Sequence, residues 1–267
     1  MKLTSDNYYQ PESDKAFWSA STWREFSACP SAFVARLNGE YKKPTSKAML
    51  VGSYVDRALL TPDKLQSWIE EHGDDLFCGK DGATPTADLR RGLQMVEVAR
   101  KSEDFMRLLS GDHQAIVEFE LFGWPWKAML DVADEPSSTL VDLKTTAELT
   151  AEDWSGAIRR YRPWYDEYIP QLAVYREAFR AKYGSYPQNI ALAVVTRQDP
   201  PALGVIDFAR CVPRMEQAIR GIESEIKWRS AVRAGEMPPP SINAKGLPCD
   251  CPLCRTKGVL RYEAIEE

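Results

Sequence analysis

A carboxylate and an amine stand two residues apart in the segment TLVDLKTT, residues 139–146. Side chains alternate along a strand, so Asp142 and Lys144 would share one face while Val141 and Leu143 share the other. Charged side chains are uncommon on a strand that is otherwise built for the interior. The segment therefore predicts a strand that is half core and half reactive site.

A second carboxylate, Asp131, comes before the turn that leads into this strand. Antiparallel pairing would bring Asp131 close to Asp142, and two such carboxylates repel each other unless a cation lies between them. Oxygen ligands with open positions suit Mg²⁺ or Mn²⁺, which also bind phosphate oxygens. Lys144 would face the phosphate or the attacking water, so the predicted chemistry is hydrolysis of a phosphodiester.

The periodicity of apolar residues predicts the elements that must position these groups. Helical spacing predicts helices over residues 19–37 with an interruption at Pro30, and over 47–60, 86–109, 168–183 and 213–234. Alternation predicts strands over residues 115–122, 126–133, 139–146, 190–196 and 203–209. Short turns between the first three strands predict an antiparallel meander.

The composition limits the class of protein. The chain has 267 residues, 44% of them hydrophobic, which is enough for the core of one large domain. No run of about 18 apolar residues is present, and the first residues lack the apolar segment of a secretory signal. We therefore expect a cytoplasmic protein without a membrane partner. A formal net charge of -5 gives no overall attraction to nucleic acid, so a surface for it must be local.

Four segments resemble motifs of the PD-(D/E)xK nuclease superfamily, in particular of the phage RecE-like exonucleases and the RecB-type nuclease domains. The first is the strand with Asp142 and Lys144, preceded by Asp131. QLAVYREAF is similar to the Q-x-x-x-Y helix of RecB-type nucleases, VGSYVDRALL to the family's G-x-x-x-H segment, and EFELFGWPWK to its glutamate strand. The resemblance covers essentially the whole chain.

This resemblance implies a fold and a set of site residues. The fold would be α/β, with a restriction-endonuclease-like core in which helices flank a central mixed sheet. A single nuclease domain over residues 1–267 would comprise a mainly helical part (1–110), the catalytic core (115–235) and a cysteine-bearing tail (236–267) that packs on the N-terminal helix. The catalytic residues would be Asp131, Asp142, Lys144, Glu120, Gln171 and Tyr175, and the metal-binding residues Asp131, Asp142, Asp56 and Leu143.

One of these positions departs from the family pattern, and another allows a choice between two glutamates. Asp56 stands where the family commonly has a histidine, and aspartate binds Mg²⁺ more naturally than histidine does. Glu118 and Glu120 lie on the same face of their strand, and Glu120 is favoured because it stands nearer to GWPWK.

Three of the six cysteines form a C-x-C-x-x-C segment, comprising Cys249, Cys251 and Cys254. A closed metal site needs a fourth thiolate, for which Cys29 is the best candidate. The arrangement resembles that of the helicase-nuclease AddB and of CRISPR adaptation nucleases, in which one early and three late cysteines bind a [4Fe–4S] cluster. Zn²⁺ is the alternative, since four thiolates bind it equally well. Cys78 and Cys211 are isolated and are expected to be buried or incidental thiols.

Arginines and aromatic residues are clustered in AIRRYRPWYDEY, residues 157–168. Guanidinium groups bind phosphates and rings stack on unpaired bases, whereas a solvated loop is the competing interpretation. The predicted DNA-binding residues are Arg159, Arg160, Arg162 and Tyr161.

The leading hypothesis from the resemblance is a Mg²⁺-dependent DNA exonuclease of the RecE-like type, which resects one strand of linear double-stranded DNA from 5′ to 3′. Such enzymes serve phage recombination with a single-strand annealing protein as partner, in the host cytoplasm, and related exonucleases form ring-like homo-oligomers. One alternative is a RecB-like or CRISPR-adaptation-like nuclease that acts on single-stranded DNA or 3′ ends. Another is a non-catalytic, metal-stapled DNA-binding module.

Overall fold

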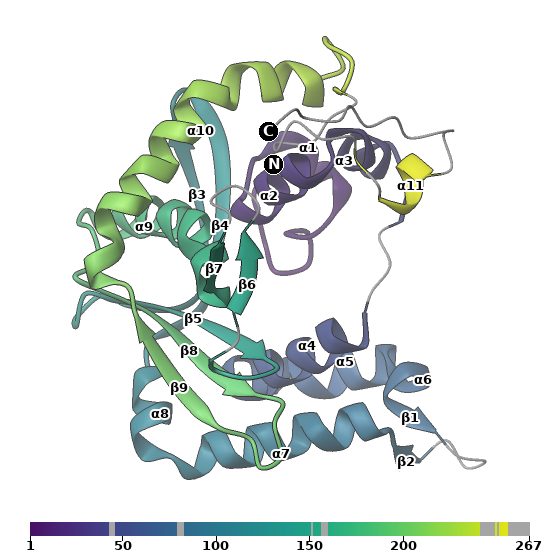
Figure 1. Ribbon diagram of the computed structural model, residues 1–267, viewed down its shortest axis with the longest axis vertical. Coiled ribbons are helices and arrows are strands. Elements are labelled where there is room, and N and C mark those ends of the chain that lie inside the picture. The colour runs from purple at the N-terminus through teal and green to yellow at the C-terminus, as the bar shows by residue number, and fades with distance from the viewer. Residues whose placement is uncertain are drawn as a thin grey trace.

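The computed structural model describes residues 1–42, 46–78, 83–150, 152–155, 160–240, 249 and 251–255, and for residues 152–155 and 160–162 it describes the backbone alone. A five-stranded mixed sheet forms the centre, and helices pack on both of its faces (Figure 1). This architecture confirms the predicted α/β fold class.

The sheet has the spatial strand order β3-β4-β5-β8-β9. Its strands are β3 (Asp112–Leu121), β4 (Trp124–Asp134), β5 (Thr139–Thr146), β8 (Asn189–Thr196) and β9 (Leu203–Asp207). The first three form the predicted antiparallel meander, and the β3–β4 hairpin turns at Phe122 and Gly123, whose φ values of 55° and 76° suit a type I′ turn. β5 then pairs in parallel with β8 after a crossover through helix α9 (Ile169–Tyr183).

The part of the chain before the sheet is largely helical, as predicted. It comprises α1 (Pro11–Ala16), α2 (Ala20–Ala28), α3 (Pro30–Leu37), α4 (Lys47–Leu60), η1 (Pro62–Lys64), α5 (Leu65–Glu71), α6 (Gly73–Leu76), α7 (Ala87–Lys101), α8 (Glu103–Leu108) and the two-stranded ribbon of β1 (Phe77–Cys78) and β2 (Thr84–Pro85). The later elements outside the sheet are β6 (Glu152–Ser155), β7 (Arg160–Pro163), η2 (Trp164–Tyr168), η3 (Ala209–Cys211), α10 (Val212–Arg233) and α11 (Pro252–Arg255). Among the helices that the structure describes, none combines the length and apolar composition needed to span a membrane.

Differences from the predicted elements have local causes. The helix predicted over residues 19–37 divides at Cys29, because Pro30 has no amide hydrogen with which to continue α2. The helix predicted over 86–109 divides at Ser102, whose hydroxyl accepts a hydrogen bond from Phe105 N and caps α8. The unpredicted α1, α5, α6, β6 and β7 are only four to seven residues long, too short to show a periodic pattern.

Each face of the sheet buries its own apolar cluster. One cluster joins α4, α7 and α8 to residues that include Val141 and Leu143, and the other joins α9 and α10 to residues that include Leu140 and Leu192. The predicted alternation along β5 is therefore confirmed. Asp142 lies among these residues and is fully buried, so its charge must be compensated by a partner or a cation.

The first 18 residues are fixed against β4 by a buried lysine. The Lys127 side chain is 1% exposed, and its Nζ donates hydrogen bonds to Tyr8 O at 2.5 Å, Ser13 Oγ at 2.7 Å and Asp14 Oδ1 at 2.7 Å. Its backbone N–H also donates to Trp18 O at 2.7 Å. Because removing one partner of a buried ion pair commonly costs about 3–5 kcal/mol, this network holds the segment firmly in place.

Candidate active site

The site forms where strands β4 and β5 separate. Their ladder consists of three pairs, from Asp134↔Thr139 to Val132↔Val141, and the next residues in this register are Asp131 and Asp142. In place of a ladder bond, Leu143 N donates to Asp131 Oδ2 at 2.9 Å. β4 continues past Asp131 to Asp134, one residue beyond the end that the alternation predicted. A cavity of about 550 Å³ opens at this point, and both carboxylates line it.

Lys144 lies between the two carboxylates. Its Nζ is 2.5 Å from Asp142 Oδ2 and 3.9 Å from Asp131 Oδ2. The Asp142 side chain is 1% exposed, whereas Lys144 and Asp131 keep 19% and 17% exposure. Lys144 and Asp131 can therefore reach a molecule in the cavity, while Asp142 forms its floor.

The third carboxylate, Asp56, reaches the cavity from helix α4. Gln114 Nε2 donates to Asp56 Oδ2 at 2.8 Å, and Gln114 lies between His113 and Ala115, which pair with Val132 and Leu130 of β4. Gly52 allows α4 to lie close to β5, since a Cβ atom there would be 3.1 Å from Thr145 Oγ1. The G-x-x-x-D spacing thus places its glycine at the helix–sheet contact and its aspartate in the site.

The α9 residues also contact this site. Gln171 Nε2 donates to Asp142 Oδ1 at 3.0 Å, which fixes the orientation of that carboxylate. Tyr175, one turn further along the same helix face, lines the cavity. Burial raises the pKa of Tyr175, and the charges of Asp142 and Asp131 raise it further, so the phenol stays protonated.

Burial and mutual repulsion determine the charge states of the acidic cluster. Burial raises the pKa of Asp131 well above its ordinary value, and the neighbouring Asp142 adds to the rise. The pKa of Asp56 is also raised, mainly by burial, although Lys144 and Arg57 oppose the shift. Burial lowers the pKa of Lys144, but Asp142 and Asp131 outweigh it, so the pKa is raised and the amine is charged.

This donor set fits a divalent metal ion. Three carboxylates converge on one cavity, and the close contact of Asp142 Oδ2 is the ion pair with Lys144. Hard cations such as Mg²⁺ or Mn²⁺ bind oxygen ligands of this kind. Asp56, Asp131, Asp142 and the carbonyl of Leu143 would hold the ion, and its charge would relieve the repulsion among the carboxylates.

The acidic cluster makes stability depend on pH when divalent ions are absent. Because the folded-state pKa values of Asp131 and Asp56 are raised, the folded protein binds protons that the unfolded chain has released. This stabilisation is complete below the unfolded carboxyl pKa of about 4 and is lost as the pH rises through the raised values. In EDTA, we therefore expect the free energy of unfolding to increase from about pH 7 to about pH 5.

Urea unfolding at several pH values, in EDTA and in Mg²⁺, measures this effect. Mg²⁺ should reduce the pH dependence of the free energy of unfolding, because it binds the carboxylates of the folded protein in place of the protons. The Asp131→Asn variant, which has no proton to bind at this position, is the matched comparison and should lose much of the slope. An equal slope in wild type and Asp131→Asn would contradict the predicted repulsion.

Glu120 is not brought to this site. It is exposed near the far end of β3, six residues beyond Gln114, which at about 3.3 Å per residue is on the order of 20 Å along the strand. Glu118 is exposed as well, and its Oε1 accepts a hydrogen bond from Leu3 N at 2.7 Å. The β3 residue that reaches the cavity is Gln114. The family motif points to a glutamate on this strand, and the sequence therefore did not indicate Gln114.

The predicted DNA-binding segment is described only in part. Arg159 lies outside the described residues. Arg160, Tyr161 and Arg162 belong to strand β7, which pairs with β6, and the description there covers the backbone alone. Their role in DNA binding stays a prediction.

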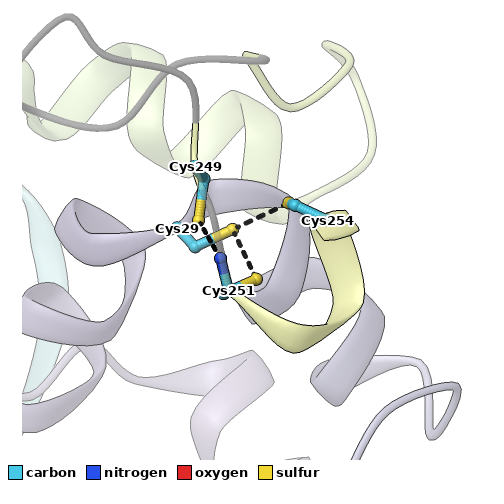
Figure 2. A group of neighbouring side chains, drawn as sticks. All are labelled: Cys29, Cys249, Cys251 and Cys254. Carbon is cyan, nitrogen blue, oxygen red and sulfur yellow. Dashed lines mark hydrogen bonds between the residues drawn. The ribbon is translucent and has the colours of Figure 1, made fainter. Parts of the chain in front are cut away.

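Four cysteines form a second candidate metal centre, shown in Figure 2. The Sγ atoms of Cys29, Cys249, Cys251 and Cys254 all lie within 4.8 Å of one another. Cys29 Sγ is 3.6 Å from Cys254 Sγ and 3.7 Å from Cys251 Sγ. The residues come from the junction of α2 and α3 and from the segment around α11, so a bound metal would join the two ends of the described chain. Cys78 is exposed and Cys211 is partly buried.

The protonation of these thiols is tied to metal binding. Burial raises the pKa of Cys29 above its ordinary value and that of Cys254 to about 11. Thiolates are the form that binds metals, so a metal ion would displace protons from this centre. The group is therefore a four-cysteine cluster with the chemistry of a metal site, as the cysteine spacing predicted.

Comparison with known proteins gives the family. The chain matches none of the curated proteins. It is similar to a crystal structure described as a "Putative exonuclease" from Eubacterium rectale, with 28% identity, a TM-score of 0.86, and coverage of 99% of this chain and 97% of the other. A solved structure of SSO0001 aligns at 14% identity over 77% of this chain and 93% of its own, but its TM-score of 0.25 supports no argument.

The family model for a "PDDEXK-like domain of unknown function", DUF3799, matches residues 19–254. The match includes the three carboxylates, Lys144 and all four clustered cysteines. The resemblance to the PD-(D/E)xK superfamily is thereby confirmed, and together with the exonuclease description it supports a nuclease. The chain belongs to the DUF3799 family of PDDEXK-like domains.

Proposed function

We propose that this protein is a Mg²⁺- or Mn²⁺-dependent DNA exonuclease. The observation that carries the proposal is the convergence of Asp56, Asp131, Asp142 and Lys144 on one cavity. The family match supports nuclease chemistry, and the description of the protein from Eubacterium rectale supports cleavage from an end.

Each site residue has a distinct part in this reaction. A divalent ion, when bound, would neutralise phosphate charge and acidify water. Lys144 is charged and stands beside the carboxylates, so it would hold a phosphate oxygen and stabilise negative charge that develops during cleavage. Gln171 fixes Asp142 by its hydrogen bond to Oδ1, and this leaves Oδ2 directed to Lys144 and the cavity.

For the substrate, we favour resection of linear double-stranded DNA from 5′ to 3′, as in RecE-like enzymes. Phage-type recombination with a single-strand annealing protein would follow from this activity, and a homo-oligomer would favour processive degradation. Arg159, Arg160, Tyr161 and Arg162 would supply local contacts to DNA, which a chain of net charge -5 requires. We place the activity in the cytoplasm, where metal-binding thiols stay reduced.

End dependence tests the proposal directly. Linear duplex DNA incubated with the protein and Mg²⁺ should be degraded, whereas covalently closed circular DNA should survive, and EDTA should stop the reaction. Duplexes labelled at the 5′ or the 3′ strand end show which end is released first and therefore give the polarity of cleavage. Duplexes with blocked ends are the control, because an exonuclease should not degrade them. Cleavage of circles, release only from 3′ ends, or DNA binding without cleavage would favour the alternative nucleases or the binding module.

At the cysteine centre, two observations support different metals. The resemblance to superfamily nucleases supports a [4Fe–4S] cluster that staples the chain ends. The sulfur distances of 3.6 and 3.7 Å support Zn²⁺, since bonds of about 2.3 Å in a tetrahedron place thiolates about 3.8 Å apart, whereas a four-iron cluster holds them further from its centre. Visible absorption and metal analysis of anaerobically purified protein distinguish the two metals.

A further inference from the structure

A second cavity adjoins the active site. Its volume is about 270 Å³, and it shares three lining residues with the active-site cavity: Tyr9, Arg57 and Gln114. It is also lined by residues from η1 and α5, among them Lys64, Trp68 and Glu71. At roughly 30 Å³ per water molecule, the volume corresponds to about nine waters, which suits a single nucleobase rather than a duplex.

Tyr9 stands at the boundary between the two cavities with an accessible ring. The residue is 71% exposed, and it contacts Tyr8 edge-to-face at 4.9 Å and Met129 Sδ through its hydroxyl at 3.6 Å. The ring therefore lines both cavities and is open to solvent. Because 71% of the residue is exposed, a ligand can reach the ring.

The position of Tyr9 is fixed although its ring is open. Tyr8 is buried, and its carbonyl accepts a hydrogen bond from the buried amine of Lys127. Ser13 and Asp14 complete this anchor on the other side of Tyr9. A ring held at low conformational cost can bind a flat ligand without first being ordered. The family match begins at residue 19, so the segment that carries Tyr9 lies outside it.

A cation lines the same two cavities as this ring. Arg57 lines both cavities, and its guanidinium stacks over the Trp68 ring at 5.0 Å from the centroid. It lines the active-site cavity together with Asp56, so a phosphate held there would share that cavity with a guanidinium. An open aromatic ring next to a phosphate-binding group matches one nucleotide, which offers a base for stacking and a phosphate for the cation.

We propose that Tyr9 is the stacking residue for the base of the nucleotide that adjoins the scissile phosphate, and that the second cavity receives this nucleotide as it leaves the duplex. This inference rests on the proposed nuclease function and extends it to a residue for which no role is assigned. Tyr9 is a binding residue in this scheme, and the hydrolytic groups remain those of the acidic site.

Stacking can be measured by fluorescence without relying on cleavage. 2-Aminopurine is placed at each of the last positions of a DNA end in turn, and its fluorescence is recorded on binding in Ca²⁺ instead of Mg²⁺. Wild type and Tyr9→Phe should quench the probe at one position next to the cleavage point, and Tyr9→Ala should not. Loss of one base–aromatic contact should also weaken DNA binding by roughly 5- to 150-fold in Tyr9→Ala.

Two controls separate this result from loss of structure or of function. Tyr186→Ala removes a partly exposed tyrosine that lines neither cavity and should leave quenching and binding unchanged. Thermal unfolding of Tyr9→Ala should match wild type, because the ring it removes is largely exposed. If wild type cleaves DNA and Tyr9→Ala still quenches at the same position, the inference on Tyr9 is wrong and the nuclease function stands. If wild type neither binds nor cleaves DNA, both are wrong.

Discussion

Replacing Lys144 with alanine should lower the rate of Mg²⁺-dependent DNA cleavage by about 10²- to 10⁴-fold. The amine lies 2.5 Å from Asp142 Oδ2, and no other lysine or arginine among the described residues pairs with the carboxylates of Asp131 or Asp142. Its loss removes charge stabilisation that is needed most in the transition state, so kcat should fall more than KM rises. Single-turnover cleavage of an end-labelled linear duplex measures the change.

The interpretation requires that the variant still folds and binds DNA. Lys182→Ala is a matched control, because this lysine pairs with Asp112 on the surface and should leave cleavage unchanged. Thermal unfolding in Mg²⁺ tests whether the metal compensates Asp142 when the amine is absent. Lys144→Ala protein that is folded, binds DNA and cleaves at the wild-type rate would exclude Lys144 from the chemistry.

Replacing Cys29 with alanine should lower the melting temperature by about 5–20 °C, whichever metal the cysteine centre holds. The other three cysteines lie close together in sequence, so Cys29 is the ligand that links the early helices to the late segment. Structural metal sites contribute strongly to folding. A loss of about 3–5 kcal/mol would shift the melting temperature of a chain of this size by roughly 2–4 °C per kcal/mol. Calorimetry, with the metal content determined in parallel, checks this.

Cys78→Ala provides the matched control for this experiment. Cys78 is exposed and lies outside the four-cysteine cluster, so the variant should keep both metal and melting temperature. The rate of cleavage per folded Cys29→Ala molecule should stay close to wild type, since the thiolates are not part of the acidic site. Equal melting temperatures for the two variants would show that the centre does not stabilise the protein.

Periodicity and motif spacing predicted the sheet, because its strands and its main helices are long enough to show a pattern. β5 and α4 begin and end where predicted, and the alternation along β5 places Asp142 on the face opposite Val141 and Leu143. The D-x-K spacing also predicted that Lys144 shares the site with Asp142, since a two-residue step returns to the same face.

Contacts between segments that are distant in sequence were harder to predict. Gln114 reaches Asp56 because β3 pairs with β4 in one particular register, and that register is not visible in the strand's own sequence. Glu120 is a polar residue on β3, like Gln114, but it lies six residues further along the strand and so does not reach the cavity. Tyr9 depends on Lys127, which looks like an ordinary strand lysine until the buried network around its amine is seen.

The hydrogen bond from Leu143 N to Asp131 Oδ2 ties the main chain to an ionisable group. A divalent ion bound to Asp131 would compete with Lys144 and with the Leu143 amide for the same carboxylate oxygens. The Leu143 amide belongs to β5, so a weaker hydrogen bond there would change the local backbone geometry of the strand. Metal binding at the acidic site and the local order of the strand that carries Asp142 and Lys144 would therefore be thermodynamically linked.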